Sequence, residues 1–314
     1  MRRLRCDKAL TTKDLHGYIV VITGATSGIG KQTALQLLRQ GATVVLAVRD
    51  TRKAHAMLSQ HAKEAACGIA EVMQCDVSSL DSVRAFASGI SGKFKALHAL
   101  MNNAGCMNCP YQKTKDGFEM QLGTNYLCPF LLTSLLLPLL EASGEGRVVN
   151  VSSANHDVFA GKRGHVELDD LFFERRKYNG WAGYAQSKLC QILHVRELAR
   201  RHPSVVCVAL HPGSVCSNVT RHMMPFAVRK MILPLERVLV GQVSDWVGIQ
   251  TGLFCLLADR AKLETGGYYA QHQSPWGVKG GWPMRSPNPE ATDDALSRSL
   301  YEKSMKLVGL EAGP

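Results

Sequence analysis

The sequence lacks the features that mark several simple classes of protein. Its 314 residues contain no internal repeat, no low-complexity tract and no linker rich in proline, glycine or serine. Charged residues make up 20% of the chain and hydrophobic residues 46%, which is ordinary for a globular protein. Disordered, collagen-like and solenoid architectures are therefore excluded. We expect a single domain spanning residues 1–314.

The spacing of the cysteine and histidine residues does not indicate a disulfide framework or a metal centre. The ten cysteines have no spacing typical of a scaffold, and Cys106 with Cys109 form one C-x-x-C element. No second C-x-x-C and no H-x-x-x-H accompanies it, so a structural role is favoured and no metal is expected. Cys207 and Cys255 lie in apolar runs typical of buried thiols, which fits a reducing compartment.

The chain has no hydrophobic run of the length that a membrane span requires. Its most apolar stretch, residues 129–140, falls short of the ~20 residues needed to cross a bilayer. Residues 1–17 are polar and lack the apolar segment of a secretion signal. We therefore expect a cytoplasmic protein, with peripheral contact to an internal membrane left open.

Positive charge is plentiful but is not gathered into one block. The formal net charge is +11, from 37 lysines and arginines against 26 acidic residues. Scattered charge of this kind indicates a solvated surface, or attraction to an anionic cofactor or membrane, and no nucleic-acid partner is expected. The basic groups occur at Arg2, Arg3 and Arg5, at Lys162 and Arg163, at 175–177, and at Arg200 and Arg201.

What the chain does contain is an alternation of short β-branched runs with helical patterns. Strands are predicted at 18–23, 42–48, 69–74, 96–101, 147–151 and 205–210, with a seventh at 267–270. Helices are predicted at 29–40, 51–66, 80–90, 115–141 and 181–201. This order predicts right-handed βαβ units. The expected fold is therefore α/β, a single doubly wound parallel sheet (Rossmann fold) with helices on both faces.

A glycine-rich turn joins the first predicted strand to the first predicted helix. Glycines there permit a tight turn and a close approach of the backbone to a pyrophosphate, and the helix N-terminus attracts the anion. A plain glycine-rich turn is the alternative, although its place in the first βαβ unit favours a cofactor site. The candidate residues are Thr23, Gly24, Ser27, Gly28, Ile29 and Gly30.

Four motifs in order carry a resemblance to a known family. The turn reads TGATSGIG, and the chain continues with NNAG at 102–105, YAQSK at 184–188 and HPG at 211–213. Over roughly residues 15–310 the chain resembles the short-chain dehydrogenase/reductase family. Arg49-Asp50, DGFEMQLGTNYLCPFLLT and YAQSKL are most similar to its retinol-dehydrogenase-like branch. The resemblance implies a cofactor half at 15–153 and a catalytic and substrate half at 154–310.

The end of the second strand indicates which nicotinamide coenzyme is used. Arg49 follows an apolar strand end, and its guanidinium can form a charge-assisted bond to a 2′-phosphate. Such a bond contributes roughly 1.5–3 kcal/mol, about a tenfold to hundredfold preference. Asp50 can instead bond the ribose of NAD or cap the next helix, and Ser27 stands where relatives carry a basic residue. NADP(H) is therefore favoured, with NAD(H) left open.

The resemblance also assigns further contacts to the cofactor. Asp76 with Val77 would hold the adenine, although Asp76 can equally serve as a helix cap. The other implied contacts are Asn103, Ala104 and Gly105 along the adenine ribose, Pro212 and Gly213 around the nicotinamide, and Ser217 at its carboxamide.

Tyr184 and Lys188 are the candidate proton-transfer pair. Reduction of a carbonyl needs a proton at oxygen, and a tyrosine can give it near neutral pH only if its pKa falls from ~10. A lysine four residues later lies one helical turn away, where its ammonium favours tyrosinate. Tyr111 and Lys115 have the same spacing but lie outside a predicted helix, beside Pro110.

Ser153 and Asn125 complete the catalytic set that the resemblance implies. Ser153 ends the fifth strand, and its hydroxyl can bond the substrate oxygen, whereas strand alternation turns Ser152 to the other side. Asn125 matches the helix asparagine that holds a water in the family's proton relay to the lysine. Cys128 and Pro129 replace the family's usual glycine nearby. His156, His165 and His211 are interpreted as loop or structural histidines.

Residues 214–241 correspond to the variable substrate lid of the family. The part from His222 onward is rich in methionine and aliphatic side chains, with Arg229, Lys230 and Arg237 interleaved. It is interpreted as a lid on an apolar pocket, and contact with a membrane surface is compatible with that. The resulting hypothesis is an NADP(H)-dependent oxidoreductase that interconverts an apolar alcohol and its aldehyde or ketone. A cofactor-binding sensor or scaffold is the alternative, and homo-oligomerisation stays open.

Overall fold

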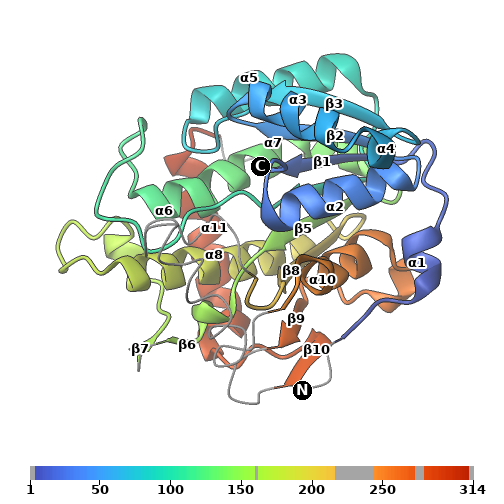
Figure 1. The fold of residues 1–314 in the computed structure, drawn as a ribbon. Helices are drawn as coiled ribbons and strands as arrows, with labels where there is room; N and C mark the ends of the chain where they lie inside the picture. The colour runs from blue at the N-terminus through green and yellow to red at the C-terminus, as the bar shows by residue number, and fades with distance from the viewer. Residues whose placement is uncertain (1–3, 160–161, 216–242, 273–278, 311–314) are drawn as a thin grey trace, which may run out of the picture.

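The architecture is one twisted sheet with helices packed on both faces (Figure 1). The computed structural model describes residues 4–159, 162–215, 243–272 and 279–310. Eight strands form the sheet in the order β10-β9-β8-β5-β4-β1-β2-β3. Their bounds are β1 Ile19–Thr23, β2 Thr43–Val48, β3 Ile69–Gln74, β4 Ala99–Asn102, β5 Arg147–Val151, β8 Val206–His211, β9 Tyr268–His272 and β10 Lys279–Met284. A two-stranded hairpin, β6 Val158–Phe159 with β7 Lys162–Arg163, lies apart from the sheet.

The strand order confirms the doubly wound fold expected from the sequence. β1 pairs in parallel with β2 on one side and with β4 on the other, so the chain reverses its direction of travel across the sheet between them. The carboxyl ends of strands at such a switch point are where this fold binds ligands. The seventh predicted strand is present as β9, parallel to β8.

Strand β10 was not predicted, and its composition explains why. It reads KGGWPM and pairs antiparallel with β9 at the edge of the sheet. Glycine and proline weaken a central strand but are tolerated at an edge, where one side needs no ladder partner. Pairing with β9 therefore makes β10 a strand, although its sequence has no strand pattern.

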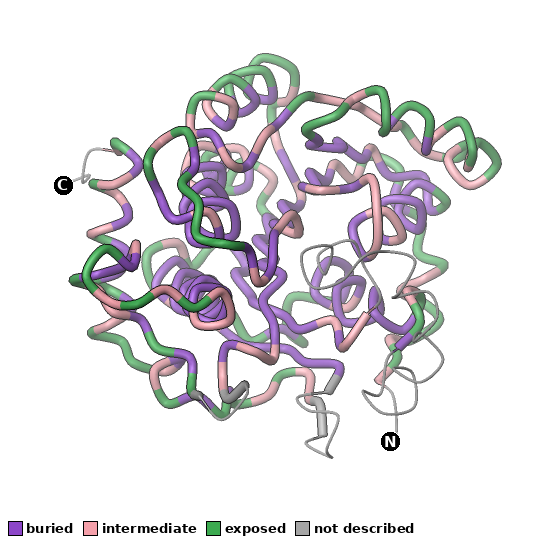
Figure 2. The backbone as a smooth tube through the Cα atoms, turned by 60° about the vertical axis from the view of Figure 1, so that its left-hand side comes forward, coloured by how far each residue is buried: buried purple, intermediate pink, exposed green. Residues whose placement is uncertain are grey.

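The helices divide between the two faces, and alternate residues of each strand serve the two layers. Val21 belongs to the core under α5, α7, α8 and α11, whereas Val20 and Ile22 face the core under α2, α3 and α10. Figure 2 shows the buried residues concentrated in these layers. The bounds are α2 Gly28–Arg39, α3 Thr51–Gln60, α5 Leu80–Lys93, α7 Cys128–Ala142, α8 Gly180–Arg201, α10 Asp245–Leu257 and α11 Asp294–Leu307, with short α1 Lys8–Thr12 and α4 Ala62–Ala65.

The helix predicted over 115–141 begins later and is not uniform. Glu119 caps α6 (Met120–Leu122) by accepting from the N–H groups of Gln121 and Leu122. Before it, Lys113 and Glu119 form an isolated β-bridge around Gly117, whose φ is +84°. After it, a π-helical turn, η1 Gly123–Leu127, leads into α7. The start predicted at residue 115 was therefore wrong, because the bridge and its glycine turn end the helical pattern.

The segment Met120–Ala142 has the length and apolarity of a membrane span, yet 78% of its most apolar window is buried inside the protein. Its α7 part packs beside α5 and against β4, and its leucines belong to the core. Burial of this kind is typical of a core helix. The sequence prediction had placed the apolar run at 129–140 only.

Helices α10 and α11 were not predicted. In α10 ten of the thirteen residues are buried, so the helix has no polar face to reveal its period. Its neighbours α2 and β9 supply the surfaces that make it a helix of the core. The proposed substrate lid, 214–241, and Ser217 within it lie outside the described residues apart from Ser214 and Val215.

Candidate active site

The glycine turn and the NNAG segment meet at the switch point of the sheet. The Thr23 hydroxyl, at the end of β1, accepts hydrogen bonds from the N–H groups of Asn103 and Ala104, both at 2.9 Å. The Asn103 side chain donates to the Thr23 carbonyl at 2.8 Å. These bonds hold the turns after β1 and β4 side by side, so the two predicted cofactor segments form one surface.

The turn has the shape that a pyrophosphate requires. Gly24 and Gly28 have φ of +68° and +52°, a region that favours glycine. A Cβ on Gly30 would lie 2.7 Å from the Gly24 carbonyl oxygen and 2.4 Å from Asn103 Nδ2, so a larger residue there would force the turn to shift. The Ser27 side chain does not cap α2, and the first turn of α2 has no acidic residue. Its N–H groups therefore suit a ligand anion, and these residues fit a dinucleotide cofactor.

Arg49 and Asp50, the two residues considered for the choice of coenzyme, follow β2 and differ in their contacts. Both Arg49 and Asp50 are exposed. The Asp50 carboxylate accepts from the backbone N–H of Lys53 at 3.1 Å and thereby caps α3. Of the alternatives for Asp50, the structure thus shows the helix cap.

Asp76 and Val77, the residues expected at the adenine, lie shortly after the end of β3. The Asp76 carboxylate accepts from the N–H of Ser78 at 3.0 Å and from its hydroxyl at 2.7 Å. Ser79, not Asp76, caps α5. Val77 is 9% exposed. Asp76 thus shapes the turn without being the helix cap.

Tyr184 and Lys188 lie on α8, which begins after Asn179 caps it. Both side chains are buried, and the ammonium lies 5.7 Å from the centre of the Tyr184 ring. Lys188 Nζ donates to the Val151 carbonyl at the end of β5 at 2.7 Å. Burial raises the pKa of Tyr184 to about 12 and lowers the pKa of Lys188 to about 8, since both charged forms lose water.

Ser153 lies at the same end of β5 and faces Tyr184. A side-chain hydrogen bond between them opposes the effect of burial and lowers the pKa of Tyr184. The Ser153 hydroxyl also accepts from the N–H of Asn155 at 3.2 Å. The Ser152 hydroxyl instead donates to the Lys188 carbonyl at 2.7 Å and so contacts the backbone of α8. The structure therefore brings together the hydroxyls of Ser153 and Tyr184.

Asn125 lies in the π-helical turn and is fully buried. Its side chain accepts from the N–H of Cys106 and donates to the Cys106 carbonyl, both at 2.9 Å. It also donates to the Ser187 hydroxyl at 2.9 Å. The replacement of the family's glycine by Cys128 and Pro129 is therefore accompanied by a π turn, with Asn125 tied to the loop after β4 and to α8.

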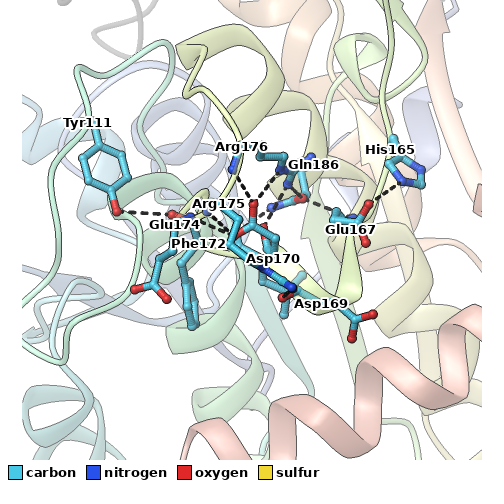
Figure 3. A network of polar contacts seen from close by, with 11 residues as sticks. Tyr111, His165, Glu167, Asp169, Asp170, Phe172, Glu174, Arg175, Arg176 and Gln186 are labelled. Atoms are coloured by element: carbon cyan, nitrogen blue, oxygen red, sulfur yellow. Dashed lines mark hydrogen bonds and ion pairs between the residues drawn. The ribbon is translucent and has the colours of Figure 1, made fainter.

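The competing pair at Tyr111 lies elsewhere. Tyr111 is 42% exposed, and its hydroxyl donates to the Phe172 carbonyl at 3.3 Å (Figure 3). Lys113 pairs with Glu174 beside it. This tyrosine is part of a surface network at the segment that precedes α8, not of the site around Tyr184.

The same network contains an anchor that the sequence analysis did not identify. The Asp170 carboxylate accepts from the N–H groups of Glu174, Arg175 and Arg176 (Figure 3). Gln186, two residues after Tyr184, is fully buried and donates to the Leu171 carbonyl at 2.8 Å. Arg176 also donates to Gln186. The segment before α8 is thus fastened to the catalytic helix, and no local motif indicated it.

The remaining candidates occupy supporting positions. His156 is fully buried, its Nδ1 contacts the Ser153 carbonyl and its Nε2 the Ser286 hydroxyl, and burial lowers its pKa to about 4. His165 is paired with Glu290. Pro212 and Gly213 follow β8, with Gly213 at φ +89°. Within the described ranges no three His, Cys, Asp or Glu side chains are grouped to hold a metal.

Comparisons with known proteins agree with the fold and the motifs. The family model of short chain dehydrogenases matches residues 18–162. Retinol dehydrogenase 13 of Homo sapiens is 38% identical over 302 residues, covering 94% of this chain and 86% of its own length. Retinol dehydrogenase 12 of Homo sapiens is also 38% identical, covering 96% and 89%.

A solved structure extends the likeness to the whole fold. A putative uncharacterized protein from Mycobacterium paratuberculosis superposes with a TM-score of 0.75 at 32% identity and covers 99% of both chains. The chain therefore belongs to the short-chain dehydrogenase family, in its retinol-dehydrogenase-like branch, and is with that family an oxidoreductase of alcohols and carbonyl compounds.

Proposed function

We propose that this protein is an NADP(H)-dependent oxidoreductase that interconverts an apolar alcohol and its aldehyde or ketone. The observation that carries the proposal is the buried Tyr184 with the Ser153 side chain beside it, which lowers the pKa of Tyr184, and with the Lys188 ammonium 5.7 Å from the centre of its ring. Lys188 contacts the carboxyl end of β5 and lies against the loop after β4, which is hydrogen-bonded to Thr23 at the start of the glycine turn.

The bound nicotinamide supplies or accepts the hydride, and the protein manages the proton. In the reductive direction the Tyr184 hydroxyl donates its proton to the carbonyl oxygen while the Ser153 hydroxyl bonds that oxygen. In the oxidative direction Tyr184 takes the proton of the alcohol. Because burial raises the pKa of Tyr184 to about 12, nearby positive charge is needed to favour tyrosinate. Lys188 supplies such a charge from the same helix.

The preference for NADP(H) rests on the end of β2. Asp50 is engaged as the cap of α3, which leaves its carboxylate less suited to the ribose hydroxyls of NAD. Arg49 is exposed beside it and can reach a 2′-phosphate. A charged hydrogen bond of roughly 1.5–3 kcal/mol gives about one to two decades of preference.

The apolar substrate is inferred from the sequence and from relatives. Residues 222–241 are rich in methionine and aliphatic residues and offer few groups to bind a sugar or an acid. The relatives at 38% identity are named retinol dehydrogenases, and retinol is an apolar primary alcohol. We therefore take retinal and long straight-chain aldehydes as the first probes.

The test has two stages. Calorimetric titrations with NADPH and with NADH should show that NADPH binds more tightly. Oxidation of NADPH is then followed at 340 nm with retinal, hexanal and decanal in turn. Consumption of NADPH with the apolar aldehydes supports the proposal. Tight NADPH binding without turnover on any carbonyl compound would instead favour a cofactor-binding sensor or scaffold.

A further inference from the structure

The side chain of Gln191 joins the catalytic lysine to the π-helical turn. Gln191 lies one turn after Lys188 on α8 and is 1% exposed. Its Oε1 accepts from Lys188 Nζ at 3.3 Å, and its Nε2 donates to the backbone carbonyl of Asn125 at 2.6 Å. One buried amide therefore contacts both the lysine of the proton-transfer pair and the main chain of the asparagine turn.

Both neighbours require the same orientation of this amide. An ammonium can only donate and a backbone carbonyl can only accept. With the amide reversed, Gln191 Nε2 would face the Lys188 ammonium and its Oε1 the Asn125 carbonyl, and both hydrogen bonds would be lost in a buried place. The side chain thus has one satisfied state, and it holds its two neighbours at a set separation.

The carbonyl of Asn125 is available to Gln191 for a reason visible in the sequence. In a regular α-helix this carbonyl would accept from the N–H four residues later, but that residue is Pro129, which has no N–H. The helix passes through the π turn at Gly123–Leu127 instead. The Gln191 amide supplies the donor that the proline cannot.

We propose that Gln191 is a positioning residue of the acid–base site, whose amide holds the Lys188 ammonium in its place beside Tyr184. The geometry of the loop after β4 supports this. A Cβ on Gly105 would lie 3.6 Å from Lys188 Nζ and 2.9 Å from Asn125 Oδ1, so the ammonium lies against the NNAG loop of the cofactor surface. The role of Lys188 in proton transfer rests on the proposed function, whereas the position of its ammonium rests on the contacts alone.

The contact has a consequence that needs no substrate. The titratable side chains that face Lys188 are Tyr184 on α8 and Cys106 after β4. From β5 the Val151 carbonyl contacts the ammonium, whereas the Asn125 carbonyl of η1 contacts Gln191. An acceptor on the ammonium favours its charged form, so loss of the amide oxygen lowers the pKa of the lysine. A carboxylate in its place raises that pKa.

The experiment is an NMR titration of the cofactor-free protein labelled with ¹³C at the lysine ε carbon, whose shift reports protonation of Nζ. The Lys188 signal is assigned by its loss in Lys188→Ala. In Gln191→Met, which keeps the length of the side chain, the midpoint should fall by about one pH unit, the equivalent of one hydrogen bond to a charged group. In Gln191→Glu the midpoint should rise.

The matched control is Gln186→Met, at another buried glutamine of α8, whose side chain donates to the Leu171 carbonyl. It should lower the melting temperature and leave the Lys188 midpoint unchanged. Where Gln191→Met does not fold, Gln191→Glu carries the test. An unmoved Lys188 midpoint in the folded Gln191 variants overturns the inference.

Activity gives a second readout that separates this inference from the proposed function. With retinol and NADP⁺, the acidic limb of the kcat profile should move to higher pH in Gln191→Met, because a less charged Lys188 favours tyrosinate less. Inactive Tyr184→Phe together with an unmoved Gln191→Met profile would overturn the inference alone. An active Tyr184→Phe would overturn the proposed function and leave the result of the NMR titration standing.

Discussion

The Asp50 carboxylate accepts a hydrogen bond from the backbone N–H of Lys53 at 3.1 Å, which makes it the cap of α3. Arg49, the preceding residue, is exposed and lies outside α3, whose cap is Asp50. Adjacent residues at the end of β2 thus have different roles, one in forming α3 and the other, as we propose, in binding the coenzyme.

The first prediction concerns that difference. Arg49→Ala should weaken NADPH binding by about one to two decades and leave NADH binding little changed, since only NADPH carries the 2′-phosphate. Calorimetric dissociation constants for both coenzymes measure this. Arg52→Ala removes another exposed arginine nearby and should affect neither. Equal losses for both coenzymes in Arg49→Ala would show that Arg49 is structural.

The second prediction concerns proton transfer. Tyr184→Phe should abolish turnover while NADPH binding stays nearly intact, because the change removes only the hydroxyl. Lys188→Ala should damage both, since the ammonium lies against the NNAG loop of the cofactor surface. Stopped-flow turnover and NADPH titration separate the effects. Tyr111→Phe, in the other YxxxK segment, is the control and should retain full turnover; near-normal turnover in Tyr184→Phe would contradict the mechanism.

The third prediction concerns the substrate. If the pocket is apolar, kcat/KM for straight-chain aldehydes should rise with chain length. Each buried CH₂ contributes ~0.8 kcal/mol, about fourfold per carbon until the pocket is filled. Short polar carbonyl compounds should be poor substrates. Rates from butanal to decanal at fixed NADPH test the series, and a flat or falling trend would point to a small polar substrate.

The segment 222–241, which is rich in methionine and aliphatic residues, also contains basic residues, and these lead to an expectation about membrane binding. Arg229 and Lys230 stand among its apolar residues. Vesicles with anionic lipid should therefore retain the protein at low salt and release it at high salt. Retention that does not depend on salt would argue against an electrostatic contact.

The fourth prediction concerns acid stability. Burial lowers the pKa of His194 to about 3 and that of His156 to about 4, against 6.5 in an unfolded chain. Both are neutral when folded, so the unfolded state takes up more protons below pH 6.5. Stability should be full above pH 6.5 and fall as the pH drops toward 4, by up to about 1.4 kcal/mol per pH unit for each histidine.

Urea unfolding at pH 7.5, 6 and 5 measures this dependence. His194 packs beside the aromatic rings of Tyr126, Phe130 and Tyr301, so His194→Phe keeps an apolar ring in place and removes one titrating group. The free energy of unfolding of His194→Phe should vary less steeply with pH, because unfolding of this variant takes up about one proton fewer. An unchanged slope would show that His194 is not the source.

Local pattern was sufficient for much of this protein. The β-branched runs predicted the parallel sheet, and the glycine turn from Thr23 to Gly30 follows β1 as its position in the sequence indicated. The reason is physical: strand period, glycine torsion and the lysine one turn after Tyr184 are properties of neighbouring residues in sequence. The pairing of Tyr184 with a serine at the end of β5 followed from the family pattern, since Ser153 lies 31 residues earlier in the chain.

Tertiary structure decided what depends on partners distant in the chain. β10 is a strand because β9 lies beside it, and α10 is a helix without a polar face because the core surrounds it. The amide of Gln191 meets the carbonyl of Asn125 across 66 residues of sequence, through a π turn that spacing did not predict. Such contacts are set by how helices pack on the sheet, and a buried polar group must find its partner there.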